Sequence, residues 1–340
     1  MKKVIHLGPG ESQGGIATVM NNMKSNTPNG YYSEVINTHC DGSMIQKISI
    51  WKNARKLLKR KIRKKDIDIA HIHATHSISW WRKADLKRIC EKNSIPVVMH
   101  IHSGRFEEFC SRFFGLTGYL VRKILSSGCK VVILEERWRD ILRKWIPENS
   151  IVIPNPSYKK ISRENKVKEK IQILMLSRNS RGKGHKFAIN VLRSLETKGV
   201  DAKLIMTGIN QEEIGKNNRK SIEAKGWISE KEKNELMLKS DFLIMPSEFE
   251  GSSMSVIESM TNSLPCLVSP ASSQTIGIDE LVIPLDNVEE WSEKIISLSN
   301  QDEYDRIVNL ITLQSEKYSI GNNIKNINGL YDEITRVKRQ

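Results

Sequence analysis

The chain has 340 residues, of which 39% are hydrophobic and 27% charged, and its formal net charge at neutral pH is +15. This is the composition of a globular protein, and the lack of any window near about eighteen consecutive apolar residues argues against a membrane-spanning helix. The length exceeds one ordinary domain, so we expect two domains of about 150 residues each.

The first ten residues and the cysteines both indicate a cytoplasmic protein. Met1 to Gly10 contain two lysines but few apolar residues, which is not the pattern of a secretory signal peptide. The five cysteines are scattered, and none forms a Cys-x-x-Cys pair. That usage is typical of free thiols and argues against a disulfide framework or cysteine-ligated zinc.

The positive charge lies almost entirely in the first half. Residues 1–155 contain 27 lysines and arginines against 13 acidic residues, whereas residues 156–340 contain 27 against 26. We therefore expect an anionic partner or surface on the first half.

Short apolar runs alternate with helical patterns along the first half, which is typical of βαβ units and parallel sheets. We expect strands at 4–7, 34–37, 67–73, 97–102, 130–134 and 150–153. We expect helices at about 16–26, 46–63, 80–92, 107–126 and 136–145. Pro154 to Pro156 end this series, and we interpret the polar stretch from Lys159 to Lys170 as the interdomain linker.

The same alternation begins again at Ile171. We expect strands at 171–177, 202–207, 222–227, 241–245, 265–268 and 281–284, and helices at about 184–198, 230–240, 254–262, 288–299 and 303–317. Two doubly wound sheets would place a ligand between the domains, at the carboxyl ends of the strands. A last helical pattern could return to the first domain or form a peripheral cap.

The most informative stretch, 241–269, joins a short buried strand to a loop with two glutamates. Glu250 and Glu258 are separated by seven residues, and the small residues 251–253 lie between them at the expected start of a helix. A helix N-terminus attracts anions, and a glycine lets the backbone approach a ligand. A phosphate cradle between two acids that grip hydroxyl groups describes a nucleotide-sugar site. Ordinary surface glutamates are the alternative.

This stretch resembles the donor site of the retaining GT-B glycosyltransferases of family 4, because Glu-x7-Glu follows a strand that ends in Pro246-Ser247 and precedes a helix and a Pro-led apolar run. The resemblance implies an α/β fold with two doubly wound Rossmann-like domains that face each other across a cleft. It implies an acceptor-binding domain at 1–155, joined by the C-terminal helix at about 320–340, and a donor-binding domain at 156–319.

Two cations follow the first strand of the second half. Arg178 and Lys183 share a loop that also contains glycines. Two fixed cations in such a loop suit a diphosphate leaving group, whose negative charge must be neutralised as it departs. A solvated basic loop explains the same residues without a ligand. Their spacing is similar to the Arg-x4-Lys-Gly signature of the family, which implies that both bind the donor diphosphate.

The resemblance also implies how the rest of the donor is held. The N–H groups around Ser252, Ser253 and Met254 would bind the diphosphate, Glu258 would accept hydrogen bonds from the ribose, and Glu250 from the sugar ring. These groups would do the work of a magnesium ion, so we expect no metal and no cofactor. The family loop often reads Glu-Gly-Phe-Gly, and this chain departs from it with two serines that could add phosphate contacts.

A glycine-rich turn follows the first strand of the chain and leads into a helix. Its backbone N–H groups suit a ligand, although it matches neither a Rossmann fingerprint nor a P-loop and a simple tight turn is the alternative. Similar loops in the family approach the donor phosphate or the acceptor, which implies that role for Gly14 and Gly15.

Seven of the eight histidines lie outside the second domain. The run His71-x-His73-x-Thr75-His76 is close to a zinc motif of metallo-hydrolases but lacks its acid, so we expect no metal there. Core histidines with satisfied hydrogen bonds explain His71 and His100. His102 precedes Ser103-Gly104 at a strand's carboxyl end, where members of the family place a histidine, which implies that it orients or polarises the transferred sugar.

The basic stretch from Trp51 to Lys65 has apolar residues at intervals of three and four. It could lie on an anionic membrane surface, with Trp80-Trp81 as an interfacial anchor. A solvated helix that covers the sheet explains the same spacing. RNA or DNA is a third option, but no nucleic-acid module accompanies the charge, so we expect no nucleic acid.

Together with the resemblance, these features predict a glycosyltransferase that moves a sugar from a UDP- or GDP-linked donor to a glycan or lipid-linked acceptor, in cell-surface polysaccharide or glycolipid synthesis. The resemblance implies a hexosyltransferase that retains the anomeric configuration and requires no metal. We expect it in the cytoplasm, with a peripheral position on the membrane as an option. Two other classes stay open: a nucleotide-sugar epimerase or hydrolase on the same fold, and a non-catalytic protein that binds membrane or nucleic acid through the basic half.

Overall fold

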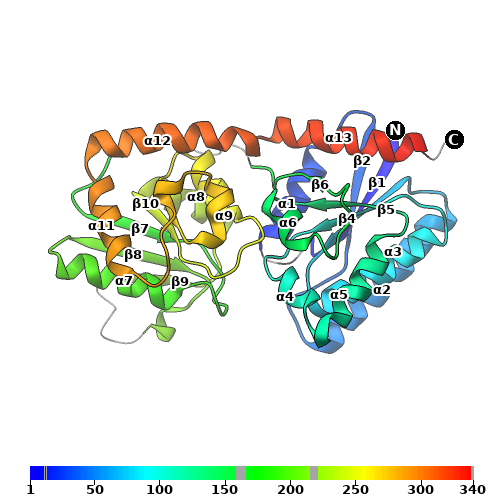
Figure 1. Cartoon of the computed structure of the whole chain (residues 1–340), viewed down its shortest axis with the longest axis horizontal. Coiled ribbons are helices and arrows are strands. Elements are labelled where there is room, and N and C mark those ends of the chain that lie inside the picture. The colour runs from blue at the N-terminus through cyan, green and yellow to red at the C-terminus, as the bar shows by residue number, and fades with distance from the viewer. Residues whose placement is uncertain (11, 13, 158–165, 215–220, 338–340) are drawn as a thin grey trace. The chain divides into compact units, whose positions relative to one another are not determined.

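A computed structural model describes residues 1–10, 12, 14–157, 166–214 and 221–337 (Figure 1). The chain divides into two compact units: unit 1 comprises Met1–Pro156 with Ser319–Gln340, and unit 2 comprises Ser157–Tyr318. The two boundaries between these units, at 156/157 and 318/319, lie within one residue of the domain limits expected from the sequence. Most of the expected linker at 159–170 lies outside the described residues.

Unit 1 is built on a parallel sheet of six strands in the order β2-β1-β3-β4-β5-β6. The strands are β1 (Lys2–Gly8), β2 (Tyr31–Asn37), β3 (Ile69–Ala74), β4 (Val97–Ile101), β5 (Cys129–Ile133) and β6 (Ile151–Val152). Every residue of β3 and β4 is buried, as expected for strands covered on both faces. Because β2 and β3 lie on opposite sides of β1, the chain reverses direction across the sheet between β1 and β3.

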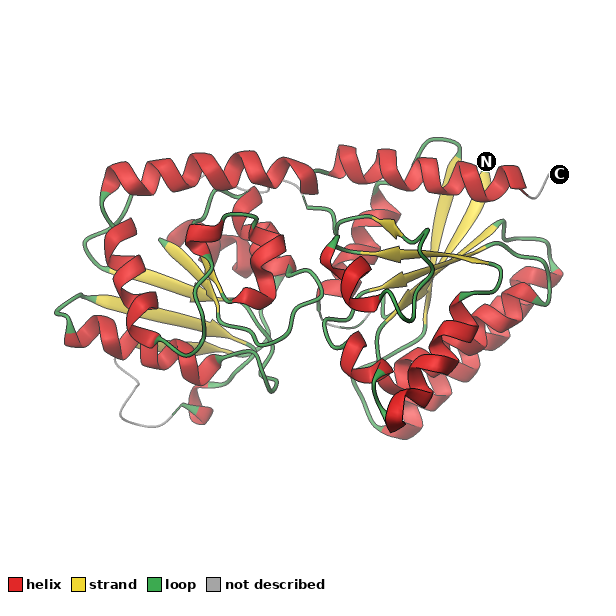
Figure 2. Cartoon of the chain, viewed as in Figure 1, coloured by secondary structure: helices red, strands yellow, loops and turns green. Residues whose placement is uncertain are grey.

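Helices cover both faces of this sheet (Figure 2). They are α1 (Gly15–Ser25), α2 (Met44–Arg63), α3 (Ser77–Glu91), α4 (Phe106–Cys110), α5 (Leu116–Leu125), α6 (Arg137–Leu142) and α13 (Ile320–Val337). The C-terminal helix α13 packs on unit 1, where the Tyr331 hydroxyl lies 2.7 Å from Nδ1 of His71. Its buried residues include Ile327, Leu330 and Ile334, which belong to the apolar pattern seen in the sequence.

The single helix expected at 107–126 is wrong. The chain instead breaks between α4 and α5, where Phe113 and Phe114 have φ of 53° and 54° and Gly115 has φ of 86°. Three consecutive residues with positive φ cannot continue a right-handed helix. The glycine was the sequence signal for this break.

Unit 2 is built on a parallel sheet of five strands in the order β11-β10-β7-β8-β9. The strands are β7 (Ile171–Met175), β8 (Ala202–Thr207), β9 (Ile222–Lys225), β10 (Phe242–Met245) and β11 (Cys266–Val268). The helices are α7 (His185–Thr197), α8 (Glu230–Lys239), α9 (Met254–Thr261), α10 (Ser273–Ile276), α11 (Val288–Leu298) and α12 (Gln301–Ser315). Here the chain reverses direction between β7 and β10.

The strand expected at 281–284 is also wrong. Val282 forms only an isolated parallel bridge with Val268, directly after a 3-10 turn at Asp279–Leu281. The Ile283 N–H donates to the Val268 carbonyl at 2.8 Å, and the next residue, Pro284, has no N–H to extend the ladder. Leu281 and Ile283 are therefore buried without forming a strand.

Candidate active site

The residues singled out in the second half lie at the carboxyl edge of the sheet of unit 2. The loop after β7 carries Arg178 and Lys183, and the loop after β10 carries Glu250 and leads into α9. Since β7 and β10 are neighbours and the direction of the chain reverses between them, both loops flank the crevice where doubly wound sheets bind ligands.

The two loops are joined by an ion pair. Nζ of Lys183 lies 2.6 Å from Oε1 of Glu250, and both side chains are partly buried. The Glu248 N–H donates to the Gly182 carbonyl at 2.7 Å, so the backbones of the loops are also connected. The structure thus brings a cation and a carboxylate from the sequence analysis together at the carboxyl ends of β7 and β10.

Gly184 explains how closely these loops approach. Its φ is 83°, and a Cβ atom at this position would lie 2.0 Å from the carbonyl oxygen of Pro246. Only glycine fits a left-handed conformation with this contact. The Lys-Gly dipeptide therefore fixes Lys183 directly beside the end of β10.

Glu258 lies on α9 and is buried, with 6% of its surface exposed. Its Oε1 lies 2.8 Å from Nζ of Lys233, which comes from α8 and also pairs with Glu230 at 2.8 Å. Burial lowers the pKa of Lys233, but the adjacent carboxylates outweigh it and the pKa of this ammonium group is raised. The ammonium group of Lys233 is therefore the charged partner of Glu258.

Sequence reasoning missed Lys233. The Ser229 and Glu232 capping box that starts α8 was readable from the sequence. That box places Lys233 in the first turns of the helix, but the contact with Glu258 joins two helices and has no local signal.

The start of α9 is closely packed. Ser252 and Ser253 are buried and Met254 is partly buried, with Ser253 as the N-cap. The Ser253 N–H donates to Oγ1 of Thr275 at 3.4 Å, and Oγ of Ser255 donates to the Leu176 carbonyl at 2.7 Å. The second of these bonds ties the first turn of α9 to the end of β7.

Arg178 is directed to the other side of β7. Its guanidinium carbon lies 5.7 Å from the centre of the Trp227 ring, and Trp227 follows β9 with about half of its surface exposed. The Gly208 N–H donates to the Gly226 carbonyl at 2.9 Å, which connects the loops after β8 and β9. Arg178 and Lys183 therefore flank the end of β7 on opposite sides.

In unit 1, the glycine loop follows β1 at the point where the direction of the chain reverses. Gly14 is the N-cap of α1 with φ of 128°, and Gly15 is the first residue of that helix. The Gly14 carbonyl accepts the N–H groups of Ala17 and Thr18 at 3.0 and 3.2 Å. Residues 11 and 13 of this loop lie outside the described part of the chain.

His102 follows β4 and ends a chain of hydrogen-bonded side chains. Its Nε2 lies 2.9 Å from Nδ1 of His73, and Nε2 of His73 lies 3.1 Å from Nδ1 of His6. Nε2 of His6 lies 3.3 Å from Oγ of Ser33. His102 is only partly buried, whereas the residues behind it are buried.

Burial disfavours the charged form of these imidazoles. It lowers the pKa of His102 to about 3 and that of His6 to about 4. The pKa of His73 also falls well below its usual value through burial and the neighbouring imidazoles. A neutral imidazole donates at one nitrogen and accepts at the other, so the tautomers along this chain are coupled.

Two groups of imidazoles are close enough to hold a metal ion. In the triplets His6, His71, His73 and His73, His100, His102, the ligand nitrogens lie within 4.8 Å of one another. Several of these nitrogens already pair with each other, and His71 also pairs with Tyr331. His76, the last residue of the zinc-like run, bonds instead to Oγ of Ser103 at 2.6 Å. This is the pattern of a hydrogen-bonded network.

Comparison with known proteins identifies the class. The model of the family described as "Glycosyl transferases group 1" matches residues 157–309, and that described as "Glycosyltransferase Family 4" matches residues 38–156. The two matches adjoin and together cover residues 38–309. The fold is that of the GT-B glycosyltransferases, and the two matches support a group 1 / family 4 glycosyltransferase.

One curated protein and two solved structures are similar to this chain over most of its length. The chain is 24% identical over 297 residues to an uncharacterised 41.2 kDa protein in the cps region of Klebsiella pneumoniae. The aligned region covers 79% of this chain and 81% of the relative. The fold of this chain is similar to that of sucrose-phosphate synthase from Thermosynechococcus elongatus, with a TM-score of 0.78 and 12% identity. The comparison covers 99% of this chain and 100% of the synthase chain. The fold is also similar to that of HepE from Anabaena, solved with UDP and glucose, with a TM-score of 0.76 and 12% identity over 98% and 100%.

Among the described residues, we find no helix with the length and apolar character that crossing a bilayer would require.

Proposed function

We propose that the protein is a retaining glycosyltransferase that transfers a sugar from a UDP- or GDP-linked donor to a glycan or lipid-linked acceptor in the synthesis of a cell-surface polysaccharide or glycolipid. The observation that carries the proposal is the Lys183–Glu250 pair at the carboxyl ends of β7 and β10, with Glu258 on the helix that follows. The cps-region relative supports a polysaccharide pathway, and the Anabaena structure with UDP and glucose supports a UDP-linked donor.

The donor diphosphate is assigned to cations and backbone dipoles. Lys183 and Arg178 flank the end of β7. The N–H groups at the start of α9, around Ser252, Ser253 and Met254, are assigned to the phosphates, which would replace the 3.4 Å bond from the Ser253 N–H to Oγ1 of Thr275. Lys183 is held by Glu250, so an incoming phosphate must take Lys183 from the carboxylate. Once released, Glu250 can accept hydrogen bonds from the sugar ring. These groups neutralise the leaving diphosphate, and we propose that no metal is required.

Glu258 is assigned to the ribose hydroxyls. Lys233 holds one of its oxygens at 2.8 Å, which leaves the other carboxylate oxygen for a ligand. A fixed carboxylate oxygen is suited to accept hydrogen bonds from neighbouring hydroxyl groups.

In unit 1, we assign His102 to the transferred sugar and the glycine loop at Gly14 and Gly15 to the donor phosphate or the acceptor. With Nε2 of His102 bonded to His73, Nδ1 is the nitrogen assigned to a sugar hydroxyl. Because burial lowers the pKa of His102 to about 3, it acts as a neutral hydrogen-bonding group at neutral pH. His102→Ala should slow transfer more than it weakens donor binding.

We propose that the protein works in the cytoplasm, next to the membrane where surface glycans are assembled. The five cysteines are free thiols dispersed over the structure, which suits a reducing compartment. The excess of positive charge in residues 1–155 suits an anionic surface.

The test begins with a thermal-stability screen against UDP-, GDP- and ADP-sugars, in which a donor that binds the folded chain raises Tm. The stabilising donor is then incubated with and without acceptor in the presence of a chelator, and NMR reads the anomeric configuration of the product. Retained configuration with chelator present supports the proposal. Inversion, or loss of turnover with chelator, contradicts it, and donor consumption without any acceptor indicates the epimerase or hydrolase.

A further inference from the structure

Large apolar side chains are exposed together at one end of unit 1. We call this set the apolar rim: Met44, Ile45, Ile48, Ile78, Trp81, Phe113, Phe114 and Leu116. Ile45 is 81% exposed, Phe113 77% and Phe114 fully exposed. The Trp80 part of the proposed interfacial anchor is wrong, because Trp80 is fully buried with its ring 5.0 Å from Phe106, whereas Trp81 is exposed.

The members of the apolar rim share one edge because they lie on the first turns of α2 and α3 and in the turn before α5. These helices follow β2, β3 and β4, whose carboxyl ends meet at a single edge of the parallel sheet. Nη1 of Arg82 donates to the Lys47 carbonyl at 3.4 Å and joins the starts of α2 and α3. The rings of Trp81 and Phe109 lie 6.1 Å apart and join α3 to α4.

The turn at Phe113 and Phe114 is costly for the fold. Both residues have positive φ, which bulky side chains rarely adopt, and the turn exposes both rings instead of burying them. Exposed apolar groups that cluster on one edge are typical of an interaction surface.

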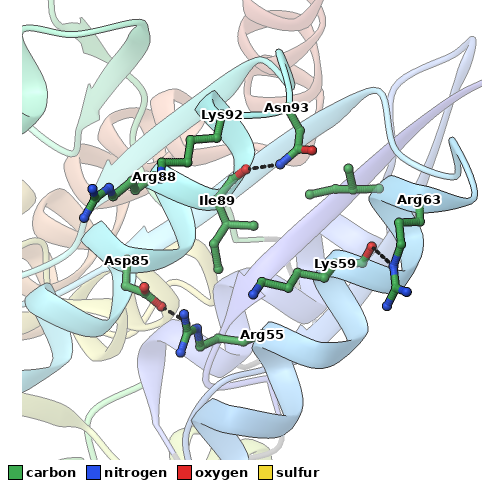
Figure 3. Close-up of a pocket in the computed structure, with 9 residues that line it drawn as sticks. Arg55, Lys59, Arg63, Asp85, Arg88, Ile89, Lys92 and Asn93 are labelled. Carbon is green, nitrogen blue, oxygen red and sulfur yellow. Dashed lines mark hydrogen bonds and ion pairs between the residues drawn. The ribbon is translucent and has the colours of Figure 1, made fainter.

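A cationic groove of about 470 Å³ lies further along the same two helices (Figure 3). Arg55, Lys59 and Arg63 of α2 line it together with Arg88 and Lys92 of α3. The only carboxylate that lines this groove belongs to Asp85, which pairs with Arg55 at 3.0 Å. A shallower hollow beside it adds Lys52 and Lys56.

The apolar rim and the groove lie on one face of α2. Positions three or four apart on a helix share a face, and this spacing links Ile45, Ile48, Lys52, Arg55, Lys59 and Arg63. The opposite face of α2 carries the buried residues Ala54 and Leu58. A helix that covers the sheet and a helix that lies on a membrane were the two alternatives for this basic stretch. The inner face of α2, with Ala54 and Leu58, covers the sheet, and the outer face is available for a membrane.

We propose that this face of unit 1 docks on an anionic lipid bilayer, with the apolar rim inserted among the lipids and the cationic groove on their phosphate head groups. A bilayer is the partner that matches both parts, because interfacial proteins combine inserted apolar residues with flanking lysine and arginine. A nucleic acid would use the groove and leave the apolar rim unpaired. A second copy of the chain would bring two strongly basic faces together.

Docking on a bilayer would extend the proposed function, and the class of acceptor that it implies rests on that function. The apolar rim lies at the same edge of the sheet as His102, which follows β4. If the protein is the glycosyltransferase proposed above, this placement selects an acceptor carried by a lipid.

The experiment is co-sedimentation of the full chain with vesicles of phosphatidylcholine, with and without phosphatidylglycerol. The unmodified chain sediments with the anionic vesicles and not with the neutral ones, and added salt weakens the binding. Lys59→Gln/Arg63→Gln lowers the affinity about 25-fold, since each cation near an anionic surface contributes about a factor of five. The control Lys24→Gln/Lys325→Gln removes the same charge from exposed positions on α1 and α13 and leaves the affinity within about twofold.

Ile45→Ser/Phe114→Ser tests the apolar rim and is expected to lower vesicle affinity about tenfold or more, with unchanged Tm because both side chains are exposed. An equal loss of vesicle affinity in the groove variant and its control overturns the proposal. Equal binding of the unmodified chain to anionic and neutral vesicles also overturns it. A dimer in sedimentation velocity that these serines dissociate, without vesicle binding, also overturns it. Stabilisation by nucleotide-sugars, measured on the same samples, reports on the donor site alone, so the two proposals fail separately.

Discussion

Nζ of Lys183 and Oε1 of Glu250 lie 2.6 Å apart and join the loop after β7 to the loop after β10. Both residues are assigned to the donor, Lys183 to the diphosphate and Glu250 to the sugar. The two side chains pair with each other, so each is held in position by the group that the donor would replace. Binding of a diphosphate therefore competes with this ion pair.

The competition predicts opposite effects of Glu250→Gln on two measurements. The neutral amide holds Lys183 less strongly, so calorimetry with UDP or GDP alone should show unchanged or several-fold tighter binding. Transfer should fall by about a hundredfold or more, since a charged hydrogen-bond partner of the sugar is lost. Glu248→Gln makes the same change at an exposed neighbour and should alter neither quantity. Weaker binding of UDP or GDP in Glu250→Gln would count against the competition.

The buried pair of Glu258 and Lys233 predicts a coupled loss of stability and binding. Glu258→Ala leaves the partly buried ammonium group of Lys233 without this carboxylate, and we expect a loss of about 2 kcal/mol in the free energy of unfolding. Lys233→Met/Glu258→Ala should recover part of that stability, because the partly buried ammonium group is removed together with the buried carboxylate and only the exposed Glu230 loses an ion pair, but should not restore nucleotide affinity. Urea unfolding and calorimetry measure the two effects. Recovery of affinity in the double variant would remove Glu258 from the donor site.

Gly184 and Gly199 provide a matched pair of alanine substitutions. Both have positive φ, 83° and 77°, but a Cβ atom at Gly184 would meet the Pro246 carbonyl oxygen at 2.0 Å, whereas one at Gly199 would meet nothing within 4 Å. Gly199→Ala should cost only about 1 kcal/mol for the strained backbone. Gly184→Ala should cost more and should also weaken donor binding, because the loop that carries Lys183 must move. Equal unfolding free energies and donor affinities in the two variants would contradict this account of the loop.

The histidine network predicts that unit 1 loses stability in mild acid. Burial lowers the pKa of His6 to about 4 and of His102 to about 3, and holds the pKa values of His71, His73 and His100 well below the usual 6.5. Between about pH 6.5 and 4 the unfolded chain binds protons that the folded chain does not. The free energy of unfolding is therefore fully retained above pH 6.5 and falls as the pH drops, by about 1.4 kcal/mol per pH unit for each such histidine.

Urea unfolding at pH 7 and pH 5 measures this dependence. The midpoint should fall at pH 5, and His6→Gln should show a shallower fall because one titrating group is removed. Equal midpoints at the two pH values would mean that these imidazoles are not held neutral.

Much of the fold could be predicted because each strand and helix has a local signature. The alternation of apolar runs and helical patterns placed the strands that precede Arg178, Lys183 and Glu250, and the rule for carboxyl edges placed the loops of these residues near one another. The break at Phe113 and Phe114 was missed because two aromatic residues in left-handed conformation oppose the usual preference for that conformation. The bridge at Val282 was missed because apolar content alone does not distinguish a strand from a buried loop.

The contacts within the candidate site depend on distant parts of the chain. The pairing of Lys233 with Glu258 joins two helices, and the network behind His102 joins β1, β3 and β4 through side chains that face the same side of the sheet. The two adjacent tryptophans show the same limit, since Trp80 is fully buried against Phe106 and Trp81 is exposed. Sequence periodicity identified the helix that carries them but did not decide which of the two faces solvent.

The central claim is that the carboxyl edge of unit 2 holds the diphosphate of a nucleotide-sugar, and calorimetric titration of the stabilising donor into Lys183→Ala tests it most directly. We expect the donor affinity to fall about thirtyfold, which corresponds to the loss of one charged hydrogen bond of about 2 kcal/mol. Lys170→Ala serves as the control, because Lys170 precedes the opposite end of β7 and pairs with Asp201; it should bind like the unmodified chain. Donor affinity in Lys183→Ala equal to that of Lys170→Ala would contradict the account.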